Sequence, residues 1–133
     1  MDKNQNIINV STDYDVIFAR MRTREVARSS GLNTPDQARV SLAVSSLAQK
    51  LGLGFNHQGK IAIETTVKDG RTGVRVVFYV RCEAEVDSSF KRLENMRWMF
   101  MVDDLKFERS DPYQVKVTAI KWSESEKASA ARG

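Results

Sequence analysis

The stretch "KIAIETTVKDGRTGVRVVFYVRCE", residues 60–83, predicts a β-hairpin. Two runs rich in β-branched residues, 60–68 and 73–82, flank the turn segment "DGRTG". In the first run, Ile61 and Ile63 alternate with Ala62 and Glu64. In the second run, apolar residues stand at every other position: Val74, Val76, Phe78 and Val80. Because successive side chains of a strand point to opposite faces, each strand is expected to bury one face.

Two helices are predicted on the N-terminal side of this hairpin, after a short strand at residues 7–10. The first spans about residues 13–30, with Gly31 placed to end it in the left-handed conformation. Its candidate N-caps are Ser11, Thr12 and Asp13. The second helix begins at Pro35, with Thr34 as the expected N-cap, and ends in the glycine-rich segment 51–59. Its apolar face is formed by Val40, Val44, Leu47 and Leu51.

On the C-terminal side, a third helix is predicted over residues 88–101 and a second hairpin over 103–111 and 113–122. The remaining residues, 123–133, are polar and small, and are expected to be a disordered tail. Strands therefore come in adjacent pairs, and helices do not strictly interleave with them. This order favours one domain over residues 1–122: an α+β, two-layer sandwich with helices on one face of a mainly antiparallel sheet.

Composition narrows the class of protein. The chain has 133 residues and a formal charge of +4, with 21 basic and 17 acidic residues interspersed. No apolar run approaches about 18 residues, and the N-terminus has no signal-peptide core, so a cytoplasmic protein without a membrane span is expected. A single cysteine, Cys82, and a single histidine, His57, exclude an internal disulfide and make a metal cluster implausible. Cys82 is expected in the core and His57 in a loop.

Three strings resemble one known family: "TDYDV" (12–16), "TPDQARVSLAVSSLA" (34–48) and "VTAIKW" (117–122). They are similar to the GHKL (histidine-kinase-like) ATPases, in the small form found in bacterial anti-sigma factors and serine-protein kinases of partner-switching modules. The nearest resemblance is to the switch kinase of the stressosome pathway. It implies the Bergerat-type ATPase fold and, in an active member, an ATP site.

The residues that would serve ATP on the second helix differ from the family pattern. By the resemblance, Ser46 and Lys50 stand where the family carries a Glu and an Asn one turn apart. The Glu activates the acceptor or water, and the Asn holds Mg²⁺ against the phosphates. Serine has no carboxylate to act as a base, and lysine donates hydrogen bonds but cannot coordinate a metal. The resemblance therefore implies a degenerate nucleotide site.

The glycines of the family's ATP site are missing as well. The segment "YVRCEAEVDSS" follows the first hairpin, where the family has an adenine-reading Asp and glycines. It offers Glu83, Glu85 and Asp87 but no glycine, and no glycine occurs between Val74 and Arg132. A phosphate-binding lid needs backbone conformations that ordinary residues resist. The resemblance thus implies a non-catalytic protein, a pseudokinase without a nucleotide cofactor.

Two surfaces are predicted to bind proteins. Arg20, Arg24 and Arg28 form a stripe on the first helix that would suit an acidic partner. The helix at 88–101 has more apolar residues than one buried stripe can hold, which makes Trp98 and Met99 interface candidates. By the resemblance, the partner would be a STAS-domain antagonist, a PP2C-type phosphatase or a sigma factor, and self-association as a homodimer is a further option.

Two other function classes stay open. One is an atypical ATP-dependent serine-protein kinase, or anti-sigma factor, in which Glu83 or Glu85 replaces the missing carboxylate. The other is a basic nucleic-acid-binding module, which the interspersed charges and the absence of an aromatic platform disfavour. A steep dependence of binding on salt would distinguish this module from a protein-binding regulator.

Overall fold

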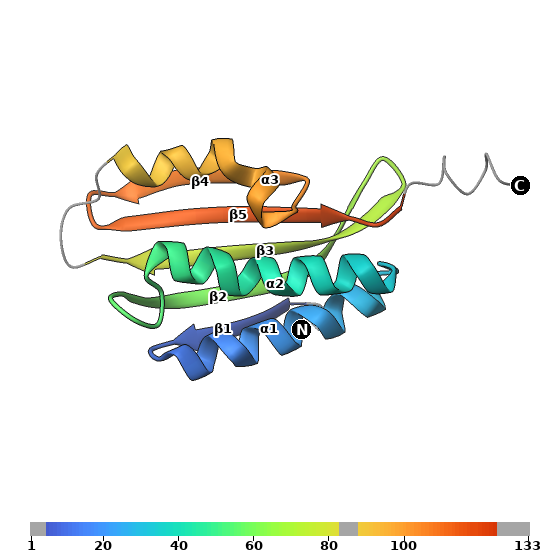
Figure 1. Cartoon of the computed structure of the whole chain (residues 1–133), viewed down its shortest axis with the longest axis horizontal. Helices are drawn as coiled ribbons and strands as arrows, with labels where there is room; N and C mark the ends of the chain where they lie inside the picture. The colour runs from blue at the N-terminus through green and yellow to red at the C-terminus, as the bar shows by residue number, and fades with distance from the viewer. Residues whose placement is uncertain (1–4, 83–87, 125–133) are drawn as a thin grey trace, which may run out of the picture.

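The computed structural model describes residues 5–82 and 88–124, and these form a two-layer α+β fold (Figure 1). The five-stranded sheet has the order β1-β2-β3-β5-β4, and every neighbouring pair is antiparallel. Helices α1 and α2 lie side by side on one face of this sheet. The strands are β1 (Gln5–Val10), β2 (Gln58–Lys68), β3 (Arg71–Arg81), β4 (Asp104–Asp111) and β5 (Gln114–Trp122). The helices are α1 (Asp13–Ser29), α2 (Thr34–Leu51), the 3₁₀ helix η1 (Ser88–Met96) and α3 (Arg97–Phe100). The predicted fold class is confirmed.

The β2–β3 hairpin has a tighter turn than the sequence suggested. Lys68 pairs with Arg71, so the loop consists of Asp69 and Gly70 alone. Both have positive φ, 53° and 76° respectively, which a two-residue hairpin turn of the Asp-Gly kind requires. The prediction that all of "DGRTG" forms the turn was wrong, because this pair reverses the chain without help from its neighbours.

Helix α1 has the predicted ends. Thr12 is the N-cap, and the carboxylate of Asp15 accepts hydrogen bonds from the backbone N–H groups of Ser11 and Thr12, at 2.9 and 3.1 Å. These bonds lower the pKa of Asp15 below its ordinary value. At the other end, Gly31 has φ 89°, in the left-handed region, as predicted.

Helix α2 begins one residue earlier than predicted. Its N-cap is Asn33, not Thr34, and the Asn33 side chain accepts a hydrogen bond of 2.9 Å from the backbone N–H of Asp36. Asparagine is among the best capping residues, since its carbonyl oxygen reaches the free N–H groups of the first turn. Gly52, with φ 70°, ends the helix.

The predicted helix over 88–101 is two shorter elements, η1 and α3. In a 3₁₀ helix, residues three apart lie on one side, and Leu93 and Met96 both pack on the core in this way. The carboxylate of Glu94 accepts a 2.6 Å hydrogen bond from the backbone N–H of Phe107 in β4. These contacts favour the tighter helix, so the single α-helix of the prediction was wrong.

The core lies between the sheet and the helices. The predicted apolar faces are buried: the alternating residues of β2 and β3 and the four apolar positions of α2. Its largest fully buried side chains include Phe78, Leu47, Leu51, Ile61 and Ile63. Within the described ranges, no helix combines the length and apolarity that crossing a bilayer demands.

Candidate functional site

Ser46 and Lys50 lie on the exposed side of α2, one turn apart, while the helix buries its opposite side in the core. Neither residue takes part in an ion pair with any other residue that the structure describes. A serine hydroxyl has no carboxylate to act as a base, and a solvated ammonium group has no lone pair with which to coordinate a metal. The chemistry available at this point of α2 is hydrogen bonding by a hydroxyl group, as donor or acceptor, and a single positive charge.

Glu83 and Glu85, the other two residues of the predicted degenerate site, lie outside the described residues, as does Asp87. Their position relative to α2 therefore stays a prediction. Among the residues that are described, no three His, Cys, Asp or Glu side chains gather in a way that could hold a metal ion.

The α3 segment presents apolar side chains to solvent. Phe100 is only 2% exposed and attaches α3 to the core beside α2. Trp98 is 73% exposed, and Met99 and Met101 are also exposed. Trp98 also borders a hollow of about 560 Å³ together with Glu94, Asn95, Arg97 and Leu105. An exposed tryptophan and two methionines are suited to an adaptable protein interface.

The predicted arginine stripe of α1 divides into two parts. Arg20 is half-buried, and its guanidinium lies 3.4 Å from the hydroxyl of Ser45, so it links α1 to α2. Arg24 and Arg28 are exposed. Only these two of the three stand free to meet an acidic partner.

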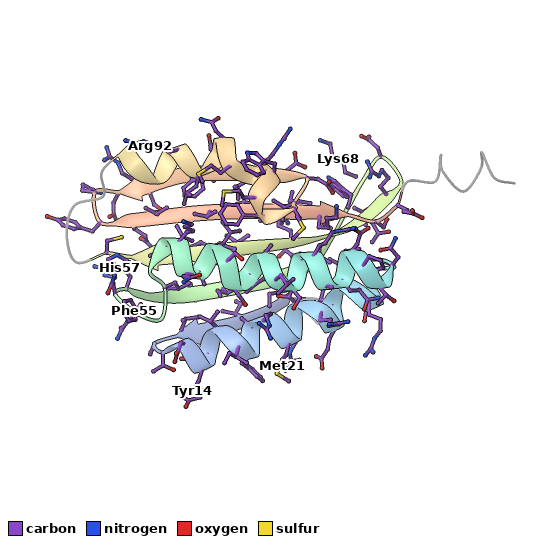
Figure 2. The ribbon with its side chains drawn as sticks, in the orientation of Figure 1. Tyr14, Met21, Phe55, His57, Lys68 and Arg92 are labelled. Atoms are coloured by element: carbon purple, nitrogen blue, oxygen red, sulfur yellow. The ribbon has the colours of Figure 1, made fainter. Side chains whose placement is uncertain are left out.

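Two other residues lie where the sequence placed them. Cys82 is buried, and burial raises the pKa of its thiol. His57 lies in the loop between α2 and β2, where its backbone N–H donates to the carbonyl of Gly52 and its carbonyl accepts from Gly54. Its side chain lies near that of Phe55 (Figure 2), and both line a polar hollow of about 480 Å³ together with Arg81.

An exposed apolar surface on α1 was not predicted from the sequence. Helix α1 exposes four large apolar side chains: Tyr14, Ile17, Phe18 and Met21. Their spacing of i, i+3, i+4 and i+7 is itself the signal for an apolar helix face. On its other side the same helix buries Val16, Ala19, Thr23 and Ala27. Its sequence therefore contains two helical repeats, one for the buried side and one for the exposed apolar side.

No protein-family model matches the chain. The chain is similar to a serine/threonine-protein kinase. This relative is RsbT of Bacillus subtilis (strain 168), with 34% identity over 74 residues. The matched segment covers 56% of this chain and 55% of RsbT, so the chain spans about half the length of the kinase it matches. The similarity therefore relates the matched segment to part of a serine/threonine-protein kinase.

Proposed function

We propose that this chain is a non-catalytic regulatory protein of a bacterial partner-switching circuit, a pseudo-ATPase that acts by binding other proteins. Its similarity to RsbT, named a serine/threonine-protein kinase, supports a place in this kind of signalling. The resemblance of its N-terminal, α2 and β5 strings to small GHKL proteins supports the same assignment.

The observation that carries the proposal is the pair Ser46 and Lys50 on α2. Phosphoryl transfer depends on a metal ion against the phosphates and a residue that positions the nucleophile. At the corresponding positions this chain has an exposed hydroxyl and an exposed cation. A lysine can touch a phosphate as a point charge, but it repels the Mg²⁺ that the reaction needs.

Missing glycines support the same conclusion. A loop that wraps phosphates does so with backbone N–H groups, and that geometry relies on glycine. From Val74 to Arg132 the chain has none. A change of two side chains on α2 would therefore leave the phosphates without their backbone cradle.

Function would then rest on protein surfaces. The partner classes that the resemblance implies are a STAS-domain antagonist, a PP2C-type phosphatase and a sigma factor. Trp98 and Met99 on α3 offer an apolar anchor, and Arg24 and Arg28 on α1 offer positive charge. Tryptophan and arginine are the residue types that most often dominate binding energy at interfaces.

The competing function is an active serine-protein kinase, favoured by the name of the relative. In this case Glu83 or Glu85 would take over the role of the missing carboxylate. The two functions differ in one measurable property, which is the affinity for Mg-ATP.

Titration calorimetry with Mg-ATP separates them, with RsbT under the same conditions as the matched control. We expect no saturable heat up to millimolar nucleotide. Binding with micromolar affinity would overturn the pseudo-ATPase. As a second arm, Ser46→Glu combined with Lys50→Asn is expected to transfer no radiolabelled phosphate to a STAS-domain partner of this chain. Transfer by this double variant would show that two side chains suffice to restore the site.

A further inference from the structure

The face of the sheet turned away from the helices has its own pattern of side chains. Core residues such as Ile61, Phe78 and Val117 point toward the helices, so the residues next to them in each strand point the other way. Figure 1 views the sheet from the side of α1 and α2. Residues of η1 and α3 belong to the same core, so every described helix packs on that side. The opposite face is left open.

A tyrosine flanked by two lysines forms the first of two rows of side chains on this open face. Lys60 of β2 and Lys116 of β5 stand directly opposite Tyr79 of β3, one on each side. Their ammonium groups lie over the Tyr79 ring, at 5.5 and 6.0 Å from its centre. An aromatic ring attracts cations in this way through the negative charge of its face. The row therefore presents two positive charges beside one phenol group.

An arginine flanked by two glutamines forms the second row, two residues further along β3. Gln58 of β2 and Gln114 of β5 stand opposite Arg81. The two rows meet at a hollow of about 350 Å³, whose lining includes Lys60, Tyr79, Arg81 and both glutamines. Each of these five side chains can donate a hydrogen bond. We call these two rows together the basic rows.

The positive charge of the basic rows is not neutralised within the described part of the chain. Neither their two lysines nor their arginine forms an ion pair with a residue that the structure describes. Two carboxylates of the same face pair with other cations: Glu64 with Arg75, and Glu108 with Lys106 at 3.9 Å. Uncompensated positive charge beside a hollow lined by donors attracts an anionic ligand.

The basic rows have the spacing of an extended peptide. Tyr79 and Arg81 are two residues apart on β3, which corresponds to about 7 Å. In an extended segment laid along β3, side chains two residues apart share one side and have the same spacing. One carboxylate would then meet the two lysines and the Tyr79 hydroxyl, and the next would meet Arg81 and the glutamine amides. Arginine binds a carboxylate through two parallel hydrogen bonds, which fixes the position of such a contact.

We propose that the basic rows are a docking site for a protein partner that presents an extended segment with two acidic residues in the pattern acid-x-acid. Charge and spacing identify this occupant. A nucleic acid fits less well, because both lysines already lie over the ring on which a base would stack. Glu108 stands opposite Lys116 in the register and would repel a phosphate backbone that continued across β4. The proposal goes beyond the proposed function, since it concerns another surface and does not depend on whether the chain binds Mg-ATP.

A titration of the full chain with a synthetic peptide tests the proposal. The probe is a short peptide with the central pattern Thr-Glu-Thr-Glu-Thr, and isotope-labelled protein observed by NMR reports which amides it reaches. We expect a dissociation constant below about 1 mM at low salt, with the shifted amides on β2, β3 and β5 around the basic rows. Two matched probes, one with Gln for both Glu and one with the two Glu adjacent, are expected to bind about tenfold more weakly.

Charge reversal separates the basic rows from other basic positions. Lys60→Glu and Arg81→Glu are each expected to weaken peptide binding about tenfold or more. Both residues are exposed, so the melting curves should not change. Lys68→Glu makes the same change in net charge at an exposed position and is expected to keep binding within about threefold. Figure 2 shows Lys68 at the end of the molecule opposite to Phe55 and His57.

Several results would overturn the proposal. These are the absence of saturable shifts with the acidic peptide, equal binding of the glutamine peptide, or an equal loss of affinity in Lys68→Glu. A single-stranded oligouridylate of about ten nucleotides is the competing probe. If it bound the same amides more tightly than the peptide, the basic rows would be a nucleic-acid surface instead. The Mg-ATP titration is a separate measurement, so failure here leaves the proposed function standing.

Discussion

At the scale of single residues, Lys121 of β5 joins the two layers of the fold. Its ammonium group lies 3.7 Å from a carboxylate oxygen of Asp36 in α2 and 3.5 Å from one of Asp103 before β4. The Lys121 side chain is only 15% exposed. The other carboxylate oxygen of Asp103 accepts a 2.7 Å hydrogen bond from the backbone N–H of Trp122. Lys121 therefore lies between two carboxylates, of which Asp36 also pairs with Arg39 at 2.8 Å.

Replacing Lys121 with methionine is predicted to destabilise the fold. The methylene packing is kept, but Asp103 loses the Lys121 cation and the buried Asp36 keeps its pair with Arg39 alone among the ion pairs of the described residues. Exposed ion pairs contribute about 0–1 kcal/mol and broken buried pairs cost about 3–5, so a loss of about 1–3 kcal/mol is expected. Lys106→Met is the matched control, because Lys106 pairs with Glu108 at 3.9 Å on the surface. Urea unfolding measures both, and equal effects would contradict the prediction.

Cys82 provides a prediction about pH. Burial raises the pKa of its thiol, so the folded protein resists ionising it. The unfolded thiol ionises near about pH 8.5. Since the folded pKa is the higher one, the stabilisation is complete below that pH and is lost as the pH rises toward and through the folded pKa. Between pH 7 and 10, the unmodified chain should lose more stability than Cys82→Ala. Parallel urea midpoints for the two proteins across this range would contradict the burial argument.

At the scale of elements, α3 is a short helix in which one aromatic side chain is buried and another is exposed. Phe100 lies in the core, and Trp98 lies in solvent. A helix of four residues has no stability of its own, so the burial of Phe100 fixes the position of the whole segment. The exposure of Trp98 then follows from where Phe100 points.

Two alanine variants are predicted to separate folding from binding in α3. Phe100→Ala should cost about 3–5 kcal/mol of folding free energy, as for other buried aromatic residues. Trp98→Ala should cost about 0.5 kcal/mol or less, because its side chain is mostly in water already. If Trp98 anchors a protein partner, the same variant should weaken that complex about thirtyfold. Thermal melts and partner titration measure the two effects; a large fall in the melting temperature of Trp98→Ala would place it in the core instead.

At the scale of the whole molecule, the last strand in the chain is not the last in the sheet. β5 lies between β3 and β4, and pairs with β3 from Gly73 opposite Trp122 to Arg81 opposite Gln114. Its residues Val115, Val117 and Ala119 are buried. The central part of the core therefore depends on residues from the end of the described chain.

A truncated chain tests this dependence. Ending the chain at Val102 removes β4 and β5 and leaves the edge of β3 unpaired and its core face uncovered. We predict that this fragment has no cooperative unfolding transition, since so small a domain is only marginally stable when intact. A chain ending at Glu124 keeps every strand and serves as the control, with a melt like that of the full chain. Circular dichroism against temperature compares them, and a cooperative melt of the shorter fragment would contradict the prediction.

Features that depend on neighbouring residues could be read from the sequence. The alternation of Ile61 and Ile63, the helical spacing in α2 and the glycine after α1 all express local geometry, and the structure confirms each. The adjacent pairing of strands predicted the fold class for the same reason. Where local signals competed, the prediction failed by a few residues: Asn33 rather than Thr34 caps α2, and Asp69 and Gly70 alone form the hairpin turn.

In the candidate site, too, some features could be predicted from local sequence and others could not. Ser46 and Lys50 could be placed on one side of α2 from their spacing, and they lie there, although their role stays a prediction. The residues Glu83 and Glu85, together with the predicted tail from residue 125 onward, lie outside the described residues. Trp98 and Met99 could be singled out by an excess of apolar residues, but their exposure could not be derived, because it depends on which side chain α3 buries.

What the sequence determined by itself is the five strands, the two long helices and their antiparallel, two-layer class, since periodicity and capping act over a few residues. The tertiary structure alone decided the insertion of β5 between β3 and β4, the meeting of Lys121 with Asp36, and the exposure of the second apolar face of α1. Each of these joins segments far apart in the chain, or depends on which of two competing faces the core covers. Such choices are made by packing across the whole molecule, and no local pattern encodes them.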